Sequence, residues 1–121
     1  DGCFQMTLNE MSTAIQHGAA PIVLVVNNGR YGTIRMHQEK HYPGRVSGTA
    51  LVNPDFAALA RAYGGHGEVV DEFSQLAEAF ARAKAAGTVA VIELKVDPEA
   101  LATGLTLTAA RKAGEAAQPR P

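Results

Sequence analysis

The sequence predicts an α/β fold in which a mostly parallel sheet lies between two layers of helices. Two apolar runs rich in β-branched residues, 22–26 and 88–94, alternate with segments that carry helical periodicity and helix caps. Such alternation favours a parallel sheet that is covered on both faces and joined by right-handed crossovers. With 121 residues, 46% hydrophobic and 19% charged, the chain has the composition of one folded domain and lacks the signature of disorder.

The first predicted helix begins at Thr7. Thr7 and Glu10 have the spacing of a capping box, and the apolar residues that follow recur at helical intervals. Gly18 ends this helix. The strand at residues 22–26 comes next, and because its residues show no polar alternation we expect both of its faces to be buried.

A second helix is predicted after Asn53. Asn53 is the expected N-cap, and Pro54 fits the first helical position. The remaining regular elements are a short strand at residues 67–70, a helix that ends at Gly87 and the strand at residues 88–94.

Two stretches predict less regular structure. Residues 29–51 hold no sustained period, so we expect a loop, a short helix near residues 33–39 and another loop. A stretch of this length beside a strand end is more often functional than filler. From about Thr106 onward there is no apolar stripe, which predicts a domain over residues 1–105 and a flexible tail over residues 106–121.

Composition excludes several function classes. A net charge of −1 removes the broad positive footprint of a nucleic-acid or anionic-membrane binder. The single cysteine, Cys3, excludes an internal disulfide framework and a multi-cysteine zinc site, and it fits a reducing compartment. The longest apolar run, residues 21–26, is far shorter than the roughly 20 residues that span a bilayer. Because the chain opens at Asp1 without a methionine, we interpret it as a piece of a longer protein.

The carboxyl end of the strand at residues 22–26 is the predicted ligand site, because open α/β sheets bind ligands beyond the carboxyl ends of their strands. Asn27 and Asn28 stand at that end, and Asp1 and Gly2 lie just before the first helix, where amides can receive phosphate oxygens. Carboxylate, amide and carbonyl oxygens suit Mg²⁺ bound together with a diphosphate. We therefore predict that phosphate and metal share one pocket.

These residues resemble the signature of thiamine-diphosphate-dependent enzymes. Asp1-Gly2, then residues 3–26, then Asn27-Asn28 are similar to the motif written GDG…NN in that family, whose first glycine would stand just before Asp1. The likeness continues to about residue 98 through residues 28–32, 53–60 and 91–98. The chain resembles the C-terminal, diphosphate-binding part of an acetolactate synthase or benzoylformate decarboxylase type enzyme. This implies a thiamine-diphosphate-binding fold that is truncated at its N-terminus.

The resemblance also implies roles for individual residues. Asp1 and Asn28 would supply side-chain oxygens to Mg²⁺, and Arg30 would supply its backbone carbonyl. Gly2 and Cys3 would contact the diphosphate through their backbone. Tyr31 either lines the pocket or simply packs. The implied cofactor-binding set is Gly2, Cys3, Asn28 and Tyr31.

By the same resemblance, the parent enzyme decarboxylates 2-keto acids, or ligates the product to a second carbonyl, as a lyase or transferase. The glutamate that activates the cofactor belongs, in the family, to a pyrimidine-binding domain of a neighbouring subunit. We therefore assign no catalytic residue to this chain and expect it to be inactive alone. The implied parent is a cytoplasmic homodimer or homotetramer that uses thiamine diphosphate and Mg²⁺. Its partners are its remaining domains and a 2-keto acid, with no nucleic acid and no membrane.

Which member of the family this is depends on the stretch after the asparagine pair. True acetolactate synthases usually carry a methionine and then a tryptophan there, and the chain has no tryptophan. Another decarboxylase or carboligase of the family is therefore favoured.

Other interpretations stay open beside this one. A homologue without catalysis would bind the cofactor structurally or regulate a partner. Residues 29–32 also fit the GXXG loop of an RNA-binding module, which the acidic charge and the order of elements disfavour. His37 and His41, one helical turn apart, invite a zinc hypothesis, but the pattern is not H-E-x-x-H and no third ligand is evident. Surface or substrate-loop histidines are therefore favoured.

Overall fold

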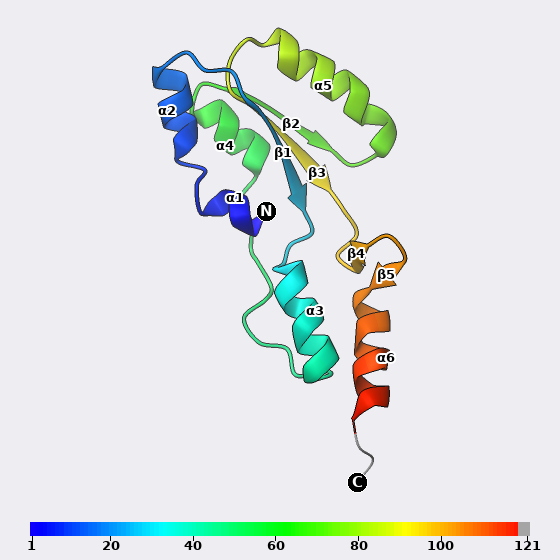
Figure 1. Cartoon of the computed structure of the whole chain (residues 1–121). Coiled ribbons are helices and arrows are strands. Elements are labelled where there is room, and N and C mark those ends of the chain that lie inside the picture. Colours follow the sequence, from blue (N-terminus) through cyan, green and yellow to red (C-terminus); the bar gives the residue numbers. More distant parts are fainter. Residues whose placement is uncertain (119–121) are drawn as a thin grey trace. The chain divides into compact units, whose positions relative to one another are not determined.

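The computed structural model describes residues 1–118 and confirms the α/β class (Figure 1). No helix within these residues is long and apolar enough to cross a membrane. Their contacts divide into two compact units, residues 1–27 with 53–96 and residues 28–52 with the segment that begins at Asp97. The elements in chain order are α1 (Gly2–Gln5), α2 (Glu10–Gln16), β1 (Ile22–Asn27), α3 (Gly32–His41), α4 (Phe56–Ala62), β2 (His66–Val70), the 3₁₀ turn η1 (Phe73–Gln75), α5 (Leu76–Ala85), β3 (Ala90–Lys95), β4 (Ala100–Ala102), β5 (Leu105–Thr106) and α6 (Leu107–Ala117).

The first unit is built on a parallel three-stranded sheet with the order β1-β3-β2. Side chains of residues 89–92, at the start of the central strand β3, alternate between two apolar clusters. Val89 and Val91 pack with residues of α2 and α4, whereas Ala90 and Ile92 pack with residues of α5. Figure 1 shows α2 and α4 on one side of the sheet and α5 on the other. The predicted three-layer arrangement is therefore confirmed.

The expectation that β1 is buried on both faces is wrong for one face. Val25 is only 2% exposed, but Leu24 and Val26, which point the other way, are 46% and 52% exposed. The apolar cluster under α5 reaches β1 only at Ile22. A continuous apolar run thus marks a strand at the edge of the three-stranded sheet, with one face uncovered over much of its length.

The start of α2 also differs from the capping-box prediction. The helix begins at Glu10, and the Glu10 amide donates to the backbone carbonyl of Thr7 at 3.0 Å, within a turn that follows α1. The end of the helix is as predicted. Gly18 adopts a φ of +65°, which lets the Ala19 amide donate to the Ala14 carbonyl at 2.9 Å.

The N-cap of α4 is Asp55 and not the predicted Asn53. Asp55 Oδ1 accepts a hydrogen bond from the Ala58 amide at 2.7 Å. Pro54 therefore lies ahead of the helix, and the side chain of Asn53 is available for contacts elsewhere in the first unit.

The second unit pairs α3 with α6, which lie side by side in Figure 1. The prediction of a flexible tail over residues 106–121 is wrong for residues 107–117, which form α6. Thr106 caps this helix, because its Oγ1 accepts a hydrogen bond from the Ala109 amide at 3.1 Å. Residues 119–121 of the predicted tail lie outside the described residues.

The packing of α6 explains why periodicity did not reveal it. Two of its three buried positions are the small residues Ala110 and Gly114. A Cβ atom on Gly114 would lie only 2.4 Å from the Glu39 carbonyl oxygen, so the backbones of α6 and α3 approach closely at this point. A contact made by small residues leaves no stripe of large apolar side chains.

Candidate functional site

Asp1 lies at the carboxyl end of β1 in the first unit. Its amino group donates to the Val26 carbonyl at 2.8 Å. Its carboxylate is oriented from two sides, because Oδ1 accepts from the Gly2 amide at 2.9 Å and Oδ2 accepts from Asn53 Nδ2 at 2.7 Å. An acidic group is therefore fixed at the carboxyl end of the strand, where the sequence predicts a ligand site.

Two asparagine side chains connect this carboxylate to a buried acid. Asn53 Nδ2 also donates to Asn27 Oδ1 at 2.8 Å, and Asn27 Nδ2 donates to Glu93 Oε1 at 2.6 Å. Lys95 Nζ donates to the same Glu93 oxygen, while Glu93 Oε2 has no hydrogen-bond partner within residues 1–118. Asp1, Asn53, Asn27 and Glu93 thus form one continuous set of hydrogen bonds, here called the acid–amide chain.

Sequence patterns do not identify Asn53 or Glu93 as residues of this site. For Glu93 a signal exists, since one acid within the apolar run of residues 89–94 must find a polar partner once it is buried. For Asn53 the capping pattern offers a competing explanation, and only the observed cap at Asp55 removes it.

Asn28 and Arg30 belong to the second unit. Asn28 Oδ1 accepts a hydrogen bond from the Arg30 amide at 3.2 Å, which closes a short turn. Arg30 also forms an isolated antiparallel bridge with Ala50. The two hydrogen bonds of this bridge, at 2.9 and 2.8 Å, are made by the neighbouring residues, so the bridge does not engage the Arg30 carbonyl.

The remaining predicted cofactor-binding residues have different surroundings. Gly2 is buried, and its amide donates a hydrogen bond to Asp1 Oδ1. Cys3 is an exposed free thiol. Tyr31 is partly buried at the N-cap of α3, and its carbonyl accepts from the Arg35 amide at 2.9 Å. The predicted site residues fall into Asp1, Gly2 and Cys3 in the first unit and Asn28, Arg30 and Tyr31 in the second.

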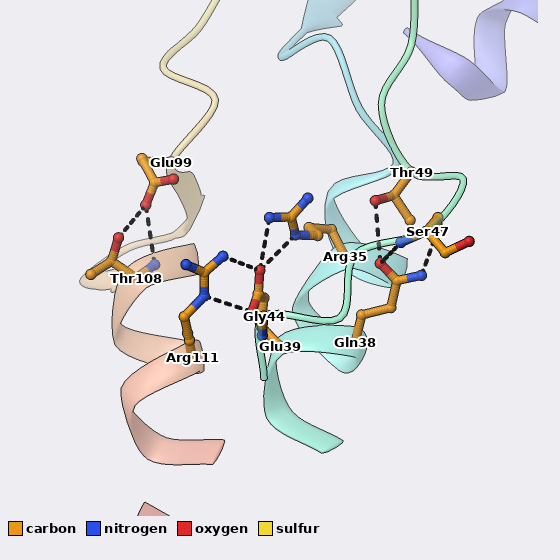
Figure 2. A network of polar contacts seen from close by, with 9 residues as sticks. All are labelled: Arg35, Gln38, Glu39, Gly44, Ser47, Thr49, Glu99, Thr108 and Arg111. Atoms are coloured by element: carbon orange, nitrogen blue, oxygen red, sulfur yellow. Dashed lines mark hydrogen bonds and ion pairs between the residues drawn. The ribbon is translucent and has the colours of Figure 1, made fainter. Parts of the chain in front are cut away.

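A carboxylate network holds α3 against α6 in the second unit (Figure 2). Glu39 is 1% exposed and accepts hydrogen bonds from Arg111 at 2.6 and 2.8 Å, from Arg35 at 2.8 Å and from the Gly44 amide at 3.0 Å. The Arg111 hydrogen bond is the main cause that lowers the pKa of Glu39 to about 2, with burial opposing it and Gly44 and Arg35 adding to it.

Gln38, the neighbouring residue, fixes the loop that follows α3. Its Nε2 donates to the Ser47 carbonyl at 2.7 Å, and its Oε1 accepts from Thr49 Oγ1 at 3.3 Å (Figure 2). Consecutive residues of α3 therefore hold the loop and α6. Because α3 begins directly after Tyr31, these contacts also support the turn that carries Asn28 and Arg30.

His37 and His41 lie on an exposed face of α3, with parallel rings whose centroids are 6.1 Å apart. Together with Ile34, Gln38 and Tyr42 they line an open groove. No group of three or more His, Cys, Asp or Glu side chains in residues 1–118 is arranged to hold a metal ion. The zinc hypothesis therefore finds no third ligand of these types in the part of the chain that the structure describes.

Comparison with known proteins gives a consistent family. Residues 1–94 match the family described as thiamine pyrophosphate enzyme, C-terminal TPP binding domain. The acetolactate synthase large subunit of Haemophilus influenzae is 41% identical over 85 residues, which are 66% of this chain and 15% of that protein. The mitochondrial acetolactate synthase catalytic subunit of Saccharomyces cerevisiae is 40% identical over 76 residues, 63% of this chain and 11% of that protein.

A solved structure is also similar. Benzoylformate decarboxylase from Polynucleobacter necessarius superposes with a TM-score of 0.76 and 27% identity, over 84% of this chain and 19% of that one. The chain thus spans less than a fifth of each of these proteins.

Proposed function

The chain belongs to the thiamine pyrophosphate enzymes, as their C-terminal TPP-binding domain, and on that basis we propose that it holds the diphosphate of thiamine diphosphate through Mg²⁺. In this proposal the whole protein decarboxylates 2-keto acids, and it protonates the product or ligates it to a second carbonyl compound. The name of the similar solved structure, benzoylformate decarboxylase, supports this substrate class, because benzoylformate is a 2-keto acid.

One observation carries the proposal. The Asp1 carboxylate is held at the carboxyl end of β1 by hydrogen bonds from Gly2 and Asn53, one to each oxygen. Ligands of open α/β sheets bind at this edge, and a carboxylate there is a hard oxygen ligand of the kind that Mg²⁺ prefers.

The proposed metal ligands are Asp1 and Asn28, through side-chain oxygens, and Arg30, through its carbonyl. All three groups are hard oxygen donors, which fits Mg²⁺ better than zinc. The geometry within each unit supports this assignment. Asn28 Oδ1 accepts one bond, from the Arg30 amide, and a carbonyl oxygen can accept two. The bridge to Ala50 leaves the Arg30 carbonyl to act as a ligand.

The diphosphate would be held through the backbone amide of Cys3 and would lie against Gly2, whose own amide donates to Asp1 Oδ1, with Asn28 and Tyr31 beside it. Gly2 is buried, and its lack of a side chain permits close approach of an anion. Cys3 would act through its backbone amide, since a thiol is a weak donor.

This chain contributes binding and orientation to the reaction. When bound, thiamine diphosphate would supply a nucleophilic thiazolium carbon and a ring that acts as an electron sink for decarboxylation of a 2-keto acid. The residues of the chain hold the diphosphate end and its cation in a fixed position. We assign no catalytic residue to residues 1–121, and we propose that the activating glutamate comes from another domain, so that the chain alone is inactive.

Two alternatives have different support. A homologue that binds the cofactor without catalysis would use the same Mg²⁺ site, and substrate turnover distinguishes it. The GXXG hypothesis has weaker support, because residues 29–32 connect β1 to α3 within an α/β fold. We further propose a cytoplasmic homodimer or homotetramer as the assembly. The single cysteine fits a reducing compartment, and the small share of the relatives that the chain spans fits association with further domains.

The proposal is tested with the whole protein that carries this chain. A panel of 2-keto acids, including pyruvate and benzoylformate, is incubated with thiamine diphosphate and Mg²⁺, and carbon dioxide release is measured. Release that depends on both additions is the expected result. Metal-dependent cofactor binding without turnover of any keto acid would instead favour the non-catalytic alternative.

Gly32 provides a local test of the Asn28 assignment. A Cβ atom at Gly32 would lie 3.0 Å from Asn28 Nδ2, so Gly32→Ala should displace the Asn28 amide by a few tenths of an ångström. We expect Mg²⁺-dependent cofactor affinity to fall about tenfold. Stability should not fall, because alanine favours a helix more than glycine does. Calorimetric titration measures the affinity, Thr33→Ala at the exposed next residue is the control, and equal affinities would argue against Asn28 as a ligand.

A further inference from the structure

The acid–amide chain has only one consistent direction. A carboxylate oxygen accepts hydrogen bonds, so Glu93 Oε1 requires the donor end of the Asn27 amide to face it. The acceptor Oδ1 of Asn27 then faces Asn53, so Asn53 must donate a hydrogen bond from its Nδ2. The same Asn53 amino group is thereby aimed at Asp1 Oδ2.

The acceptor end of Asn53 is also satisfied in this direction. Its Oδ1 accepts a hydrogen bond from Gln5 Nε2 at 2.6 Å. If the Asn53 amide were reversed, its oxygen would face Asn27 Oδ1 and Asp1 Oδ2, both of which are acceptors, and two hydrogen bonds would be replaced by repulsive contacts.

Burial makes the Glu93 end of the acid–amide chain its more rigid end. Glu93 is 1% exposed and Asn27 is 8% exposed, so a missing hydrogen bond at either one costs the full desolvation of a polar group. Asn53 and Asp1 are only partly buried. The direction is therefore fixed at both ends, by the Asp1 carboxylate and by the Glu93 carboxylate, and Glu93 is the more buried of the two.

We infer that Asn53 is a positioning residue that holds the Asp1 carboxylate for the cation, and that buried Glu93 orients Asn27, which in turn holds Asn53 in place. This inference rests on the proposed function of Asp1 as a Mg²⁺ ligand. Neither residue touches the cation in this account. Asn53 acts through Asp1, and Glu93 acts through Asn27 and Asn53.

The first test replaces Asn53 in the whole protein and measures cation affinity. Mn²⁺, which takes the same oxygen ligands as Mg²⁺, is titrated at a fixed concentration of thiamine diphosphate, and unbound Mn²⁺ is measured by electron paramagnetic resonance. Asn53→Ala is expected to weaken Mn²⁺ binding about 10-fold to 100-fold, the usual effect of removing a group that orients a ligand. Asn9→Ala, at an exposed asparagine that makes no side-chain cap bond, is the matched control and should bind as wild type.

Asn53→Asp separates positioning from charge. Aspartate has nearly the same size as asparagine but, when ionised, has no donor for Asp1, and it adds a negative charge near the cation. If charge alone mattered, Mn²⁺ affinity would rise. The inference predicts a fall of about tenfold or more. Tighter binding by Asn53→Asp, or binding by Asn53→Ala within twofold of wild type, overturns the role of Asn53.

Glu93→Gln tests the second step. Glutamine can turn either a donor or an acceptor toward Asn27, so residue 93 no longer imposes the orientation of Asn27, while the Asp1 carboxylate still requires the donor end of Asn53. We expect a loss of Mn²⁺ affinity smaller than that of Asn53→Ala, and Glu115→Gln, at an exposed residue of α6, should show none. Wild-type affinity in Glu93→Gln overturns the role of Glu93.

Melting temperatures recorded without cation or cofactor separate positioning from folding. A variant that melts at a lower temperature but keeps wild-type Mn²⁺ affinity overturns the inference, since it shows a structural role alone. The same measurements distinguish a missing cofactor site from a missing role of Asn53 and Glu93. Wild-type protein that binds neither cofactor nor Mn²⁺ overturns the proposed function and this inference with it, whereas wild-type binding with unaffected variants overturns this inference alone.

Discussion

Asp1→Ala and Asn28→Ala are each expected to abolish Mg²⁺-dependent retention of thiamine diphosphate without unfolding the protein. Each substitution removes an oxygen that we assign to the cation, and the loss should exceed the effect of removing an orienting group, so we expect at least about 100-fold weaker binding. Folding should persist, since both side chains are polar and only partly buried and neither belongs to an apolar cluster. Equilibrium dialysis with Mg²⁺ measures the retention.

Two further variants make this prediction specific. Asn28→Asp keeps an oxygen at the same place and is expected to retain the cofactor, whereas Asp71→Ala, at an exposed residue, should have no effect. Retention at wild-type affinity by both alanine variants would show that the assigned ligands are wrong.

Glu39→Gln is expected to loosen α3 and α6 by up to about 3 kcal/mol at neutral pH. The pKa of the Glu39 carboxyl is lowered from 4.5 to about 2 in the folded chain, and each unit of this difference corresponds to about 1.4 kcal/mol of stabilisation of the charged form. Because the folded value is the lower one, this stabilisation is fully present above pH 4.5 and is lost as the pH falls toward about 2. Glutamine carries no charge, so the variant should lack that acid-dependent loss.

Hydrogen exchange of peptides from residues 32–41 and 107–117 measures this effect at the two helices themselves. Protection in both peptides should fall in Glu39→Gln and stay unchanged in Glu10→Gln, because Glu10 is an exposed residue of α2 in the first unit. Unchanged protection in Glu39→Gln would mean that the Arg35 and Arg111 contacts add no net stability, as happens for many ion pairs.

The layered fold could be predicted because its signals are local. Val91 and Ile92 lie in a continuous apolar run, and the structure places them on opposite faces of the central strand under separate helices. Gly18 likewise ends α2 through its own backbone conformation. The helix α6 could not be predicted in this way. Its contact with α3 depends on Gly114, which signals close packing only when the partner backbone is known.

The sequence could indicate Asp1 and Asn27 as candidate site residues, but not the Asn53 side chain that connects them. The spacing of Asp1-Gly2 and Asn27-Asn28 marks the end of β1, and the structure brings Asp1 to that end. The link between Asp1 and Asn27 goes through Asn53, which is distant in sequence and carries a local pattern typical of a helix cap. Which of two uses an asparagine serves depends on tertiary contacts, and no local pattern contains them.

Mg²⁺-dependent cofactor binding is tested by a calorimetric titration of thiamine diphosphate into the whole protein that carries this chain, first with Mg²⁺ and then with a chelator. We predict saturable binding with Mg²⁺ and its loss in the chelator, since the proposed contacts to the diphosphate run mainly through the cation. A folded protein that shows no binding in either condition, or equal binding in both, would contradict the assignment of these residues to a Mg²⁺-dependent diphosphate site.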